Sequence, residues 1–112
     1  MYNPKREVYQ KLAELKGVAV SQSSQNVFNE VPAVTYRVAN NTANYSLDNE
    51  ITRQDIRITV DIFTEDSVTA SDVLAKVEAK MREINYRLEA SLDVPAPKGA
   101  LYHVNATFDS VR

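Results

Sequence analysis

The most regular pattern in the chain is an alternation of apolar and polar residues in ITRQDIRITVDIFTED, residues 51–66. Its apolar members share one face of an extended strand: Ile56, Ile58, Val60 and Ile62. Its polar members share the opposite face: Arg57, Thr59 and Asp61. The period of two predicts a strand with one face in the core and one face toward water or a polar partner. A strand over 51–63 would be about 40 Å long at roughly 3.3 Å per residue.

Three other segments have strand patterns. VAV at 18–20 predicts a short strand, and VPAVTYRVA at 31–39 predicts a longer one with Val34, Tyr36 and Val38 on one face. LYHVNATFDSV at 101–111 alternates in the same way. The asparagine-rich segment 40–50 has the composition of a turn. Together with the length of the following strand, it predicts a long β-hairpin arm with 40–50 at its tip.

The first helix is predicted from NPKREVYQKLAEL. Asn3 is suited to the N-cap and Pro4 to the first helical position, where a missing N–H costs nothing. The apolar residues at helical spacing are Val8, Leu12 and Leu15. Gly17 is a natural residue to follow the end of the helix.

The second helix is predicted over residues 67–90, with Ser67 or Ser71 as its N-cap. Its apolar residues step by three and four positions, as a helix that covers a core requires: Leu74, Val77, Met81, Ile84 and Leu88. Two pairs of opposite charge at i,i+4 spacing support this helix: Glu78–Arg82 and Glu83–Arg87.

These elements predict one domain, residues 1–112, with the order α-β-β-β-α-β. The corresponding fold class is α+β, with a mostly antiparallel sheet of about four strands and two helices packed on one face. The apolar face of strand 51–63 is expected to pack on the stripe of the second helix.

Composition narrows the function. The 13 Lys and Arg are scattered among 15 Asp and Glu, giving a formal net charge of −2 and no basic footprint for nucleic acid. The absence of cysteine excludes disulfides and cysteine-ligated zinc. No apolar run approaches the roughly 20 residues of a membrane span, and the first residues lack the apolar core of a signal peptide. We therefore expect a soluble protein made in the cytoplasm.

The sequence offers no convincing catalytic group. His103, the single histidine, falls on the polar side of its strand, where a surface or interface position is expected. Asp61, Glu65 and Asp66 lie close in sequence, but favourable charge at a helix N-terminus is the simpler explanation. The serines have no nearby histidine to act as a base. The prediction is therefore a protein that is not an enzyme, with no cofactor and no metal.

Two further features bear on partners. Tyr36 with Arg37 and Arg57 could stack on a base, although acidic residues interrupt the pattern and a cross-strand pair on the sheet surface is the alternative. Four apolar residues lie in polar loops: Val27, Phe28, Tyr45 and Leu47. They either contact a partner or fold back over the sheet. The candidate residues for a subunit interface are Phe28, Tyr45, Leu47, Arg57, Thr59 and Asp61.

The order and lengths of six segments resemble a known family. These segments are LKGVAV, VPAVTYRV, NYSLDNE, QDIRITVDIFTED, ASDVLAKVEAKMREINYRLEA and YHVNATF. They are similar to the tail-completion and tail-terminator proteins of long-tailed bacteriophages and prophages. The resemblance covers nearly the whole chain, and it rests on order, lengths and a few short phrases.

The resemblance implies a structural protein of the virion tail or neck that assembles in the host cytoplasm. Members form rings, usually hexameric, at the head-proximal end of the tail tube, where the ring ends tail growth and provides the surface for head joining. The implied partners are other copies of the chain, the tail-tube protein and the head-connector or neck protein, with DNA passing through the lumen without sequence-specific binding. Two alternatives stay open: a head-closure or connector protein of the neck, and a small ferredoxin-like ligand-binding or regulatory domain.

Overall fold

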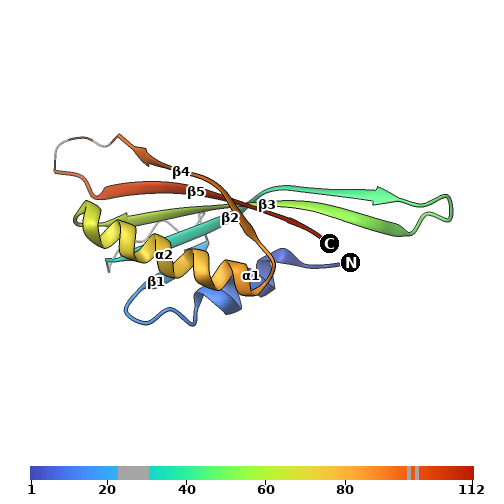
Figure 1. The fold of residues 1–112 in the computed structure, drawn as a ribbon, viewed down its shortest axis with the longest axis horizontal. Helices are drawn as coiled ribbons and strands as arrows, with labels where there is room; N and C mark the ends of the chain where they lie inside the picture. Colours follow the sequence, from blue (N-terminus) through green and yellow to red (C-terminus); the bar gives the residue numbers. More distant parts are fainter. Residues whose placement is uncertain (23–30, 96, 98) are drawn as a thin grey trace.

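A computed structural model describes residues 1–22, 31–95, 97 and 99–112 of the chain. The described residues form an α+β fold, as the sequence predicts (Figure 1). The two helices are α1 (Pro4–Leu12) and α2 (Ser67–Glu83). The strands are β1 (Ala19–Gln22), β2 (Ala33–Tyr45), β3 (Ile51–Thr64), β4 (Arg87–Val94) and β5 (Tyr102–Val111).

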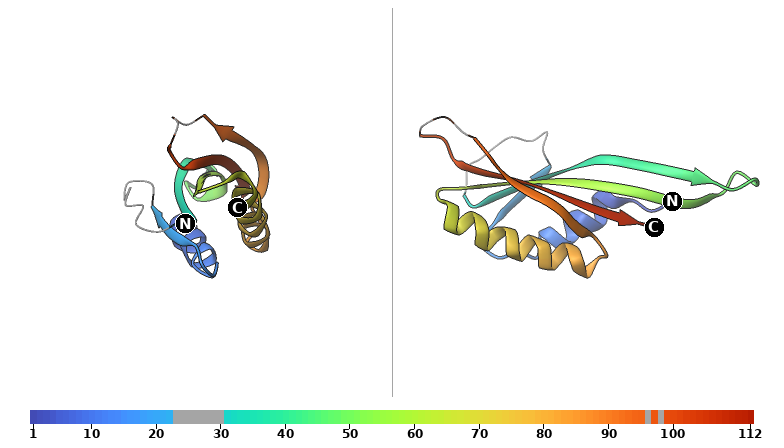
Figure 2. Two further views of the ribbon diagram at one scale, coloured as in Figure 1. Left: turned by 90° about the vertical axis from the view of Figure 1, so that its left-hand side faces the viewer. Right: turned by 45° about the horizontal axis from the view of Figure 1, so that its top comes forward.

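The strands make one five-stranded sheet in the order β1-β2-β3-β5-β4. Strand β1 pairs parallel to β2, and the other three pairs are antiparallel. The sheet is therefore mixed, with five strands where the sequence predicted about four. Both helices lie on the same face of the sheet (Figures 1 and 2). We call this the inner face and the uncovered face the outer face.

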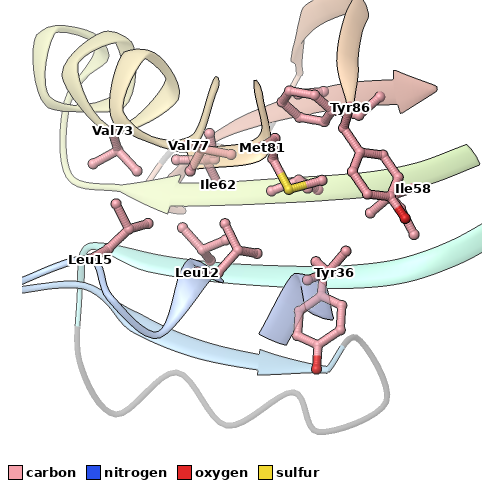
Figure 3. Close-up of a cluster of buried hydrophobic side chains, with 14 of the residues drawn as sticks. Leu12, Leu15, Tyr36, Ile58, Ile62, Val73, Val77, Met81 and Tyr86 are labelled. Atoms are coloured by element: carbon pink, nitrogen blue, oxygen red, sulfur yellow. The ribbon is translucent and has the colours of Figure 1, made fainter. Parts of the chain in front are cut away.

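The alternation in β3 sets the two faces. Ile56, Ile58, Val60 and Ile62 are all buried on the inner face, which confirms the predicted orientation of this strand. Residues Val73, Val77 and Met81 of α2 and Leu12 of α1 close the core from the other side (Figure 3). The core thus depends on the strand at the centre of the sheet meeting the apolar stripes of two helices.

Helix α1 begins as predicted and ends early. The Asn3 side chain accepts a hydrogen bond from the Lys5 N–H at 3.2 Å, and Pro4 opens the helix. The last helical residue is Leu12, so Gly17 does not follow the helix end as expected. Gly17 instead has a positive φ of 73° in the turn before β1. Leu15 lies beyond the helix and is still buried.

The N-cap of α2 is Asp66, which corrects the prediction of Ser67 or Ser71. Oδ1 of Asp66 accepts a hydrogen bond from the Thr69 backbone N–H at 2.7 Å. That bond lowers the pKa of Asp66 because it stabilises the ionised carboxylate. The carboxylate also lies at the positive end of the helix dipole, where negative charge is favoured.

Helix α2 ends at Glu83, so the predicted helix over 67–90 is too long. Asn85 adopts a left-handed backbone with φ 65°. The Asn85 N–H donates to the Arg82 carbonyl at 3.1 Å, and the Tyr86 N–H donates to the Met81 carbonyl at 3.0 Å. These two bonds form a Schellman motif, in which asparagine tolerates the left-handed position that most residues avoid.

The residues after this motif form β4, which the sequence analysis missed. Leu88 packs against the core from a strand instead of extending the helical stripe. The predicted Glu83–Arg87 pair does not form. Arg87 lies 2.7 Å from Glu89, whereas the predicted Glu78–Arg82 pair is present at 3.4 Å.

Strands β2 and β3 form the predicted hairpin, which projects beyond the helices (Figure 1). Pairing continues to Tyr45 and Ile51, so residues 40–45 are strand where the sequence predicted a turn. The chain reverses in 46–50, with a hydrogen bond of 2.8 Å from the Ser46 N–H to the Glu50 carbonyl. The projection makes the molecule 55 Å long against 26 and 23 Å in the other directions. We call residues 40–55 the arm.

The orientation of β3 can be tested by placing a charge in its buried row. Ile58→Asp should abolish cooperative folding, because an unpaired carboxylate buried against α2 costs several kcal/mol, a large part of a typical domain stability of about 5–15 kcal/mol. Thr52→Asp, on an exposed position of the same strand, should change the free energy of unfolding by less than about 0.5 kcal/mol. Chemical denaturation followed by circular dichroism measures both. An Ile58→Asp variant that unfolds like the parent contradicts the assigned face.

Candidate subunit interface

The arm ends in apolar side chains that the fold leaves in solvent. Tyr45 is 63% exposed, Leu47 is fully exposed at 104%, and Ile51 is exposed at the end of β3. The end of the β2–β3 hairpin, which carries all three, lies beyond the region that the helices cover (Figure 1). Large exposed apolar side chains that gather at a projection mark a contact surface. Neither Tyr45 nor Leu47 folds back over the sheet. Of their two interpretations, contact with a partner is therefore the one that the structure favours.

The base of the arm is tied to the N-terminal segment. Gln54 continues the inner-face row of β3 one step beyond Ile56, and its side chain is buried. Its Oε1 accepts from the Tyr2 N–H at 3.1 Å, and its Nε2 donates to the Tyr2 carbonyl at 3.3 Å and to Asn41 Oδ1 at 3.0 Å. These three bonds satisfy the polar atoms of a buried amide, as burial requires.

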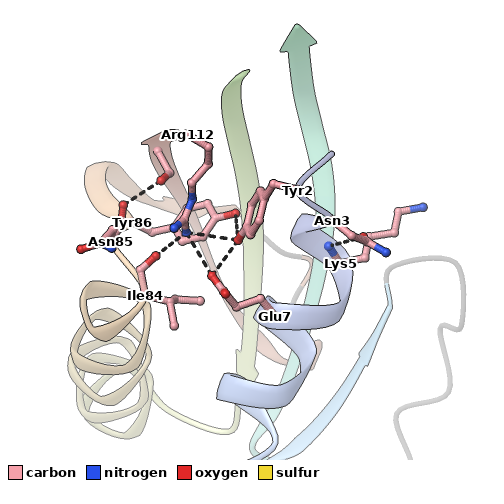
Figure 4. Close-up of polar contacts among 9 residues, drawn as sticks. Tyr2, Asn3, Lys5, Glu7, Ile84, Asn85, Tyr86 and Arg112 are labelled. Carbon is pink, nitrogen blue, oxygen red and sulfur yellow. Dashed lines mark hydrogen bonds and ion pairs between the residues drawn. The ribbon is translucent and has the colours of Figure 1, made fainter. Parts of the chain in front are cut away.

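Arg112 connects this base to both helices (Figure 4). Its Nη2 donates to Tyr2 OH and to Glu7 Oε1, each at 3.1 Å, and to the carbonyl of Ile84. Its guanidinium carbon lies 4.3 Å from the centre of the Tyr2 ring and 5.2 Å from that of Tyr86. Charge-assisted hydrogen bonds and cation–π contacts together hold α1, α2 and the arm base in one arrangement.

The two tyrosines of this cluster hold their protons tightly. Burial is the largest cause that raises the pKa of Tyr2, and hydrogen bonds with Tyr86 and Glu7 raise it further. Tyr2 OH donates to Glu7 Oε1 at 2.8 Å and lies 3.0 Å from Tyr86 OH. Burial also raises the pKa of Tyr86. The neutral phenols are therefore part of the folded state.

A second polar cluster lies on the outer face. His103 Nε2 is 2.8 Å from Asp61 Oδ1, and the Asn105 amide donates to the same oxygen at 2.9 Å. The His103 ring stacks on Phe63, with 4.3 Å between ring centres. Asp61 therefore bonds across the sheet to β5 and takes no part in the N-terminus of α2, where Asp66 lies.

Arg57 forms a bidentate ion pair with Asp109 on the same face, closer to the arm. Its Nε and Nη2 donate to the two carboxylate oxygens at 2.8 and 3.0 Å. The hydrogen bonds from Arg57 lower the pKa of Asp109. Because both partners are partly exposed, the pair contributes more to the arrangement of the surface than to stability.

The structure brings the candidate interface residues together in two places. Tyr45 and Leu47 lie at the tip of the arm, while Arg57 and Asp61 lie on the outer face, each paired with a β5 side chain. Thr59 is on the outer face but only 5% exposed, so a partner would meet the larger side chains around it. Phe28, together with Val27, lies outside the described residues.

Sequence reasoning missed the cluster at the arm base. Gln54 gave the clearest signal, because the alternation of β3 would place an aliphatic residue at this position of the row from Ile62 to Ile56. A polar residue in an apolar row indicates that the groups packed over the strand change from apolar to polar at that position. The contact of Arg112 with Tyr2 joins residues 110 positions apart, and no local pattern predicts it.

The described residues hold no group of three or more His, Cys, Asp or Glu side chains placed to bind a metal ion. None of the described helices is long and apolar enough to cross a membrane. Comparison of the chain with protein-family models and with curated proteins finds no match.

The tyrosine cluster predicts a loss of stability at alkaline pH. In the unfolded chain a tyrosine loses its proton near pH 10, whereas the raised pKa of Tyr2 keeps the folded state protonated above that pH. The free energy of unfolding should therefore fall as pH rises above about 10. Tyr2→Phe should be less stable at pH 7 by about 1–3 kcal/mol, because partners of the phenol become unsatisfied.

The difference in free energy of unfolding between the parent and Tyr2→Phe should narrow above about pH 10, since only the parent has the Tyr2 hydroxyl to titrate. Urea denaturation at pH 7 to 11 measures how the free energy of unfolding of each protein depends on pH. Tyr45→Phe, which changes a largely exposed ring, is the matched control and should follow the parent. A parallel pH dependence of parent and Tyr2→Phe contradicts the role given to the Tyr2 proton.

Proposed function

We propose that this protein is a tail-terminator or tail-completion protein of a long-tailed bacteriophage or prophage. It forms a homo-oligomeric ring, a hexamer by analogy with the family it resembles, on the head-proximal end of the tail tube. The ring ends tube growth and presents the surface to which the head connector binds. The protein acts by assembly and is not an enzyme.

The observation that carries this proposal is the arm with its exposed apolar tip. An extension that leaves Tyr45 and Leu47 in water is unfavourable for an isolated molecule and useful for one that reaches a neighbour. A contact between a projection and a different surface of the next copy is heterologous, and repetition of such a contact by rotation closes a ring. The resemblance of the six sequence segments to that family supports the same assignment.

The uncovered outer face is compatible with a ring through which DNA passes. Arg57 and Asp109 form an ion pair there, and the Asp61 carboxylate is hydrogen bonded to the His103 ring and the Asn105 amide. Paired charges and a net charge of −2 present little attraction for phosphate, so DNA could pass without strong binding.

Two other functions make different predictions. A head-closure or connector protein of the neck would form a similar ring, and its loss would leave tails of normal length that fail to join heads. A ferredoxin-like ligand-binding domain would have the order β-α-β-β-α-β. The described elements run α-β-β-β-α-β-β instead, which disfavours that layout.

Deletion of the gene from the phage or prophage that encodes it tests the proposal. Without a terminator, electron microscopy should show tails of irregular, excessive length that lack heads, and expression of the chain from a plasmid should restore uniform tails. Headless tails of normal length would favour the neck protein. Tails of normal length joined to heads would contradict both virion functions.

The role of the arm tip predicts the behaviour of a point variant. Tyr45→Ala should keep the free energy of unfolding within about 0.5 kcal/mol of the parent, because the ring is exposed. It should weaken assembly on tail tubes by tenfold or more, the effect of losing about 1.4 kcal/mol at an interface aromatic. Val68→Ala, an exposed apolar residue of α2, is the control. Unchanged assembly by Tyr45→Ala places the arm tip outside the interface.

A further inference from the structure

The geometry points to a continuous β-sheet between neighbouring copies of this chain, in which the free edge of β2 in the arm of one copy pairs with the free edge of β4 in the next. This inference deepens the proposed function, on which it rests for the existence of a ring. It names the two strands that form the subunit contact and the direction in which they pair.

Both edges are open in the described part of the chain. Strand β1 pairs with β2 only through residues 33–36, so no described strand lies beside β2 from Arg37 to Tyr45 on that side. Strand β4 is the last strand at the opposite end of the sheet and pairs only with β5. Each edge therefore offers backbone N–H and C=O groups that a further strand can bind.

The regular parts of the two edges have equal length. Register shifts in β2 fall between Val38 and Asn40 and between Asn44 and Tyr45, which leaves 40–44 as an uninterrupted stretch. The shift in β4 falls between Leu88 and Ala90, which leaves 90–94. Five residues on each side can form one regular ladder of about 17 Å at roughly 3.3 Å per residue.

Strand direction also fits. Successive antiparallel pairing of β2, β3, β5 and β4 makes β4 run opposite to β2. When a second copy continues the sheet in the same orientation, its β2 arm therefore meets β4 in antiparallel fashion. Because β1 blocks 33–36, the neighbour can pair with β2 only from Arg37 onward, and so mainly along the arm. The copies must then be staggered along the strands, as the strands of closed barrels are.

The register shifts and Pro95 lie outside the two stretches, so the stretches themselves carry few of the features that usually prevent edge pairing. Exposed edges are commonly protected by lysine, by proline or by a bulge at their centre. The stretch NNTAN at 40–44 has no charge, and ASLDV at 90–94 has one, Asp93. Asp93 interacts with Tyr102 of the same subunit and raises the pKa of that phenol. Leu92, in the middle of its stretch, is 57% exposed.

Cross-linking of introduced cysteines tests this pairing, and the chain has no cysteine of its own. Thr42 and Leu92 are the central residues of the two stretches. Both are exposed and lie on the outer face, opposite Asp55 and Asn105 of the adjacent strands. A mixture of Thr42→Cys and Leu92→Cys chains, treated with a short bis-maleimide, should give a covalent heterodimer. The double variant should give a ladder that ends at the number of copies in the ring.

The matched control replaces Leu92→Cys by Val68→Cys, which is 71% exposed on α2 and lies away from both edges. It should give no specific product with Thr42→Cys. Hydrogen exchange gives an independent result, since amides in 40–44 and 90–94 should become protected in the assembled protein relative to the monomer.

The cross-linking is done both on tail tubes and in concentrated solution of the purified chain, so that it does not depend on the gene-deletion result. A Thr42–Leu92 product in either setting supports the pairing, even if deletion leaves tails normal and the terminator function fails. Absence of this product in both settings overturns the inference. The inference is also overturned if Thr42→Cys alone gives covalent dimers as the main product, because that result means that two arms pair symmetrically.

Discussion

The packing of β3 against α2 is the interaction on which the other features depend. The buried isoleucines and valine of β3 supply the apolar face at the centre of the sheet, and α2 supplies the cover. Because β3 is longer than this cover, its inner-face row must change character where the helices end. The change occurs at Gln54, where hydrogen bonds with Tyr2 and Asn41 take the place of apolar packing. Beyond Gln54 no helix covers the inner face of β3, and the strand continues as the arm.

This arrangement explains why the molecule has two distinct surfaces for contacts. The helices occupy the inner face, so the outer face remains open and carries paired charges. The arm extends past both layers and carries exposed apolar side chains at its tip. The cluster of Tyr2, Glu7, Tyr86 and Arg112 holds the helices to the arm base, so the arm leaves the body in a defined direction. A defined direction favours a regular, repeated contact between copies, because less conformational freedom is lost on association.

Periodicity predicted the parts of the fold that depend on one face being buried. The alternation in β3 and β5 placed their residues correctly, and the length of β3 with the asparagine-rich segment 40–50 before it predicted the hairpin. The end of α2 was missed because Leu88 falls at a spacing that continues the helical stripe. The signal that opposes it is one residue, Asn85, whose left-handed conformation depends on hydrogen bonds that no spacing reveals. The arm-base cluster was missed for a related reason, since its contacts join both ends of the chain. The candidate residues of the arm tip could be predicted from apolar side chains in a polar segment, whereas the burial of Thr59 depends on neighbours from other strands.

The central claim is that the outer part of the arm, residues 43–53, stands outside the core and is stabilised only by its own strand pairing until a partner binds. Residue-resolved hydrogen exchange of the monomer tests it most directly. Amides that pair between β2 and β3 in residues 43–45 and 51–53 should exchange by local opening, orders of magnitude faster than those of residues 58–62, which should exchange only on global unfolding. Equal protection of the two groups in the monomer would mean that the arm belongs to the core, and it would contradict the separation of body and arm on which the proposed assembly depends.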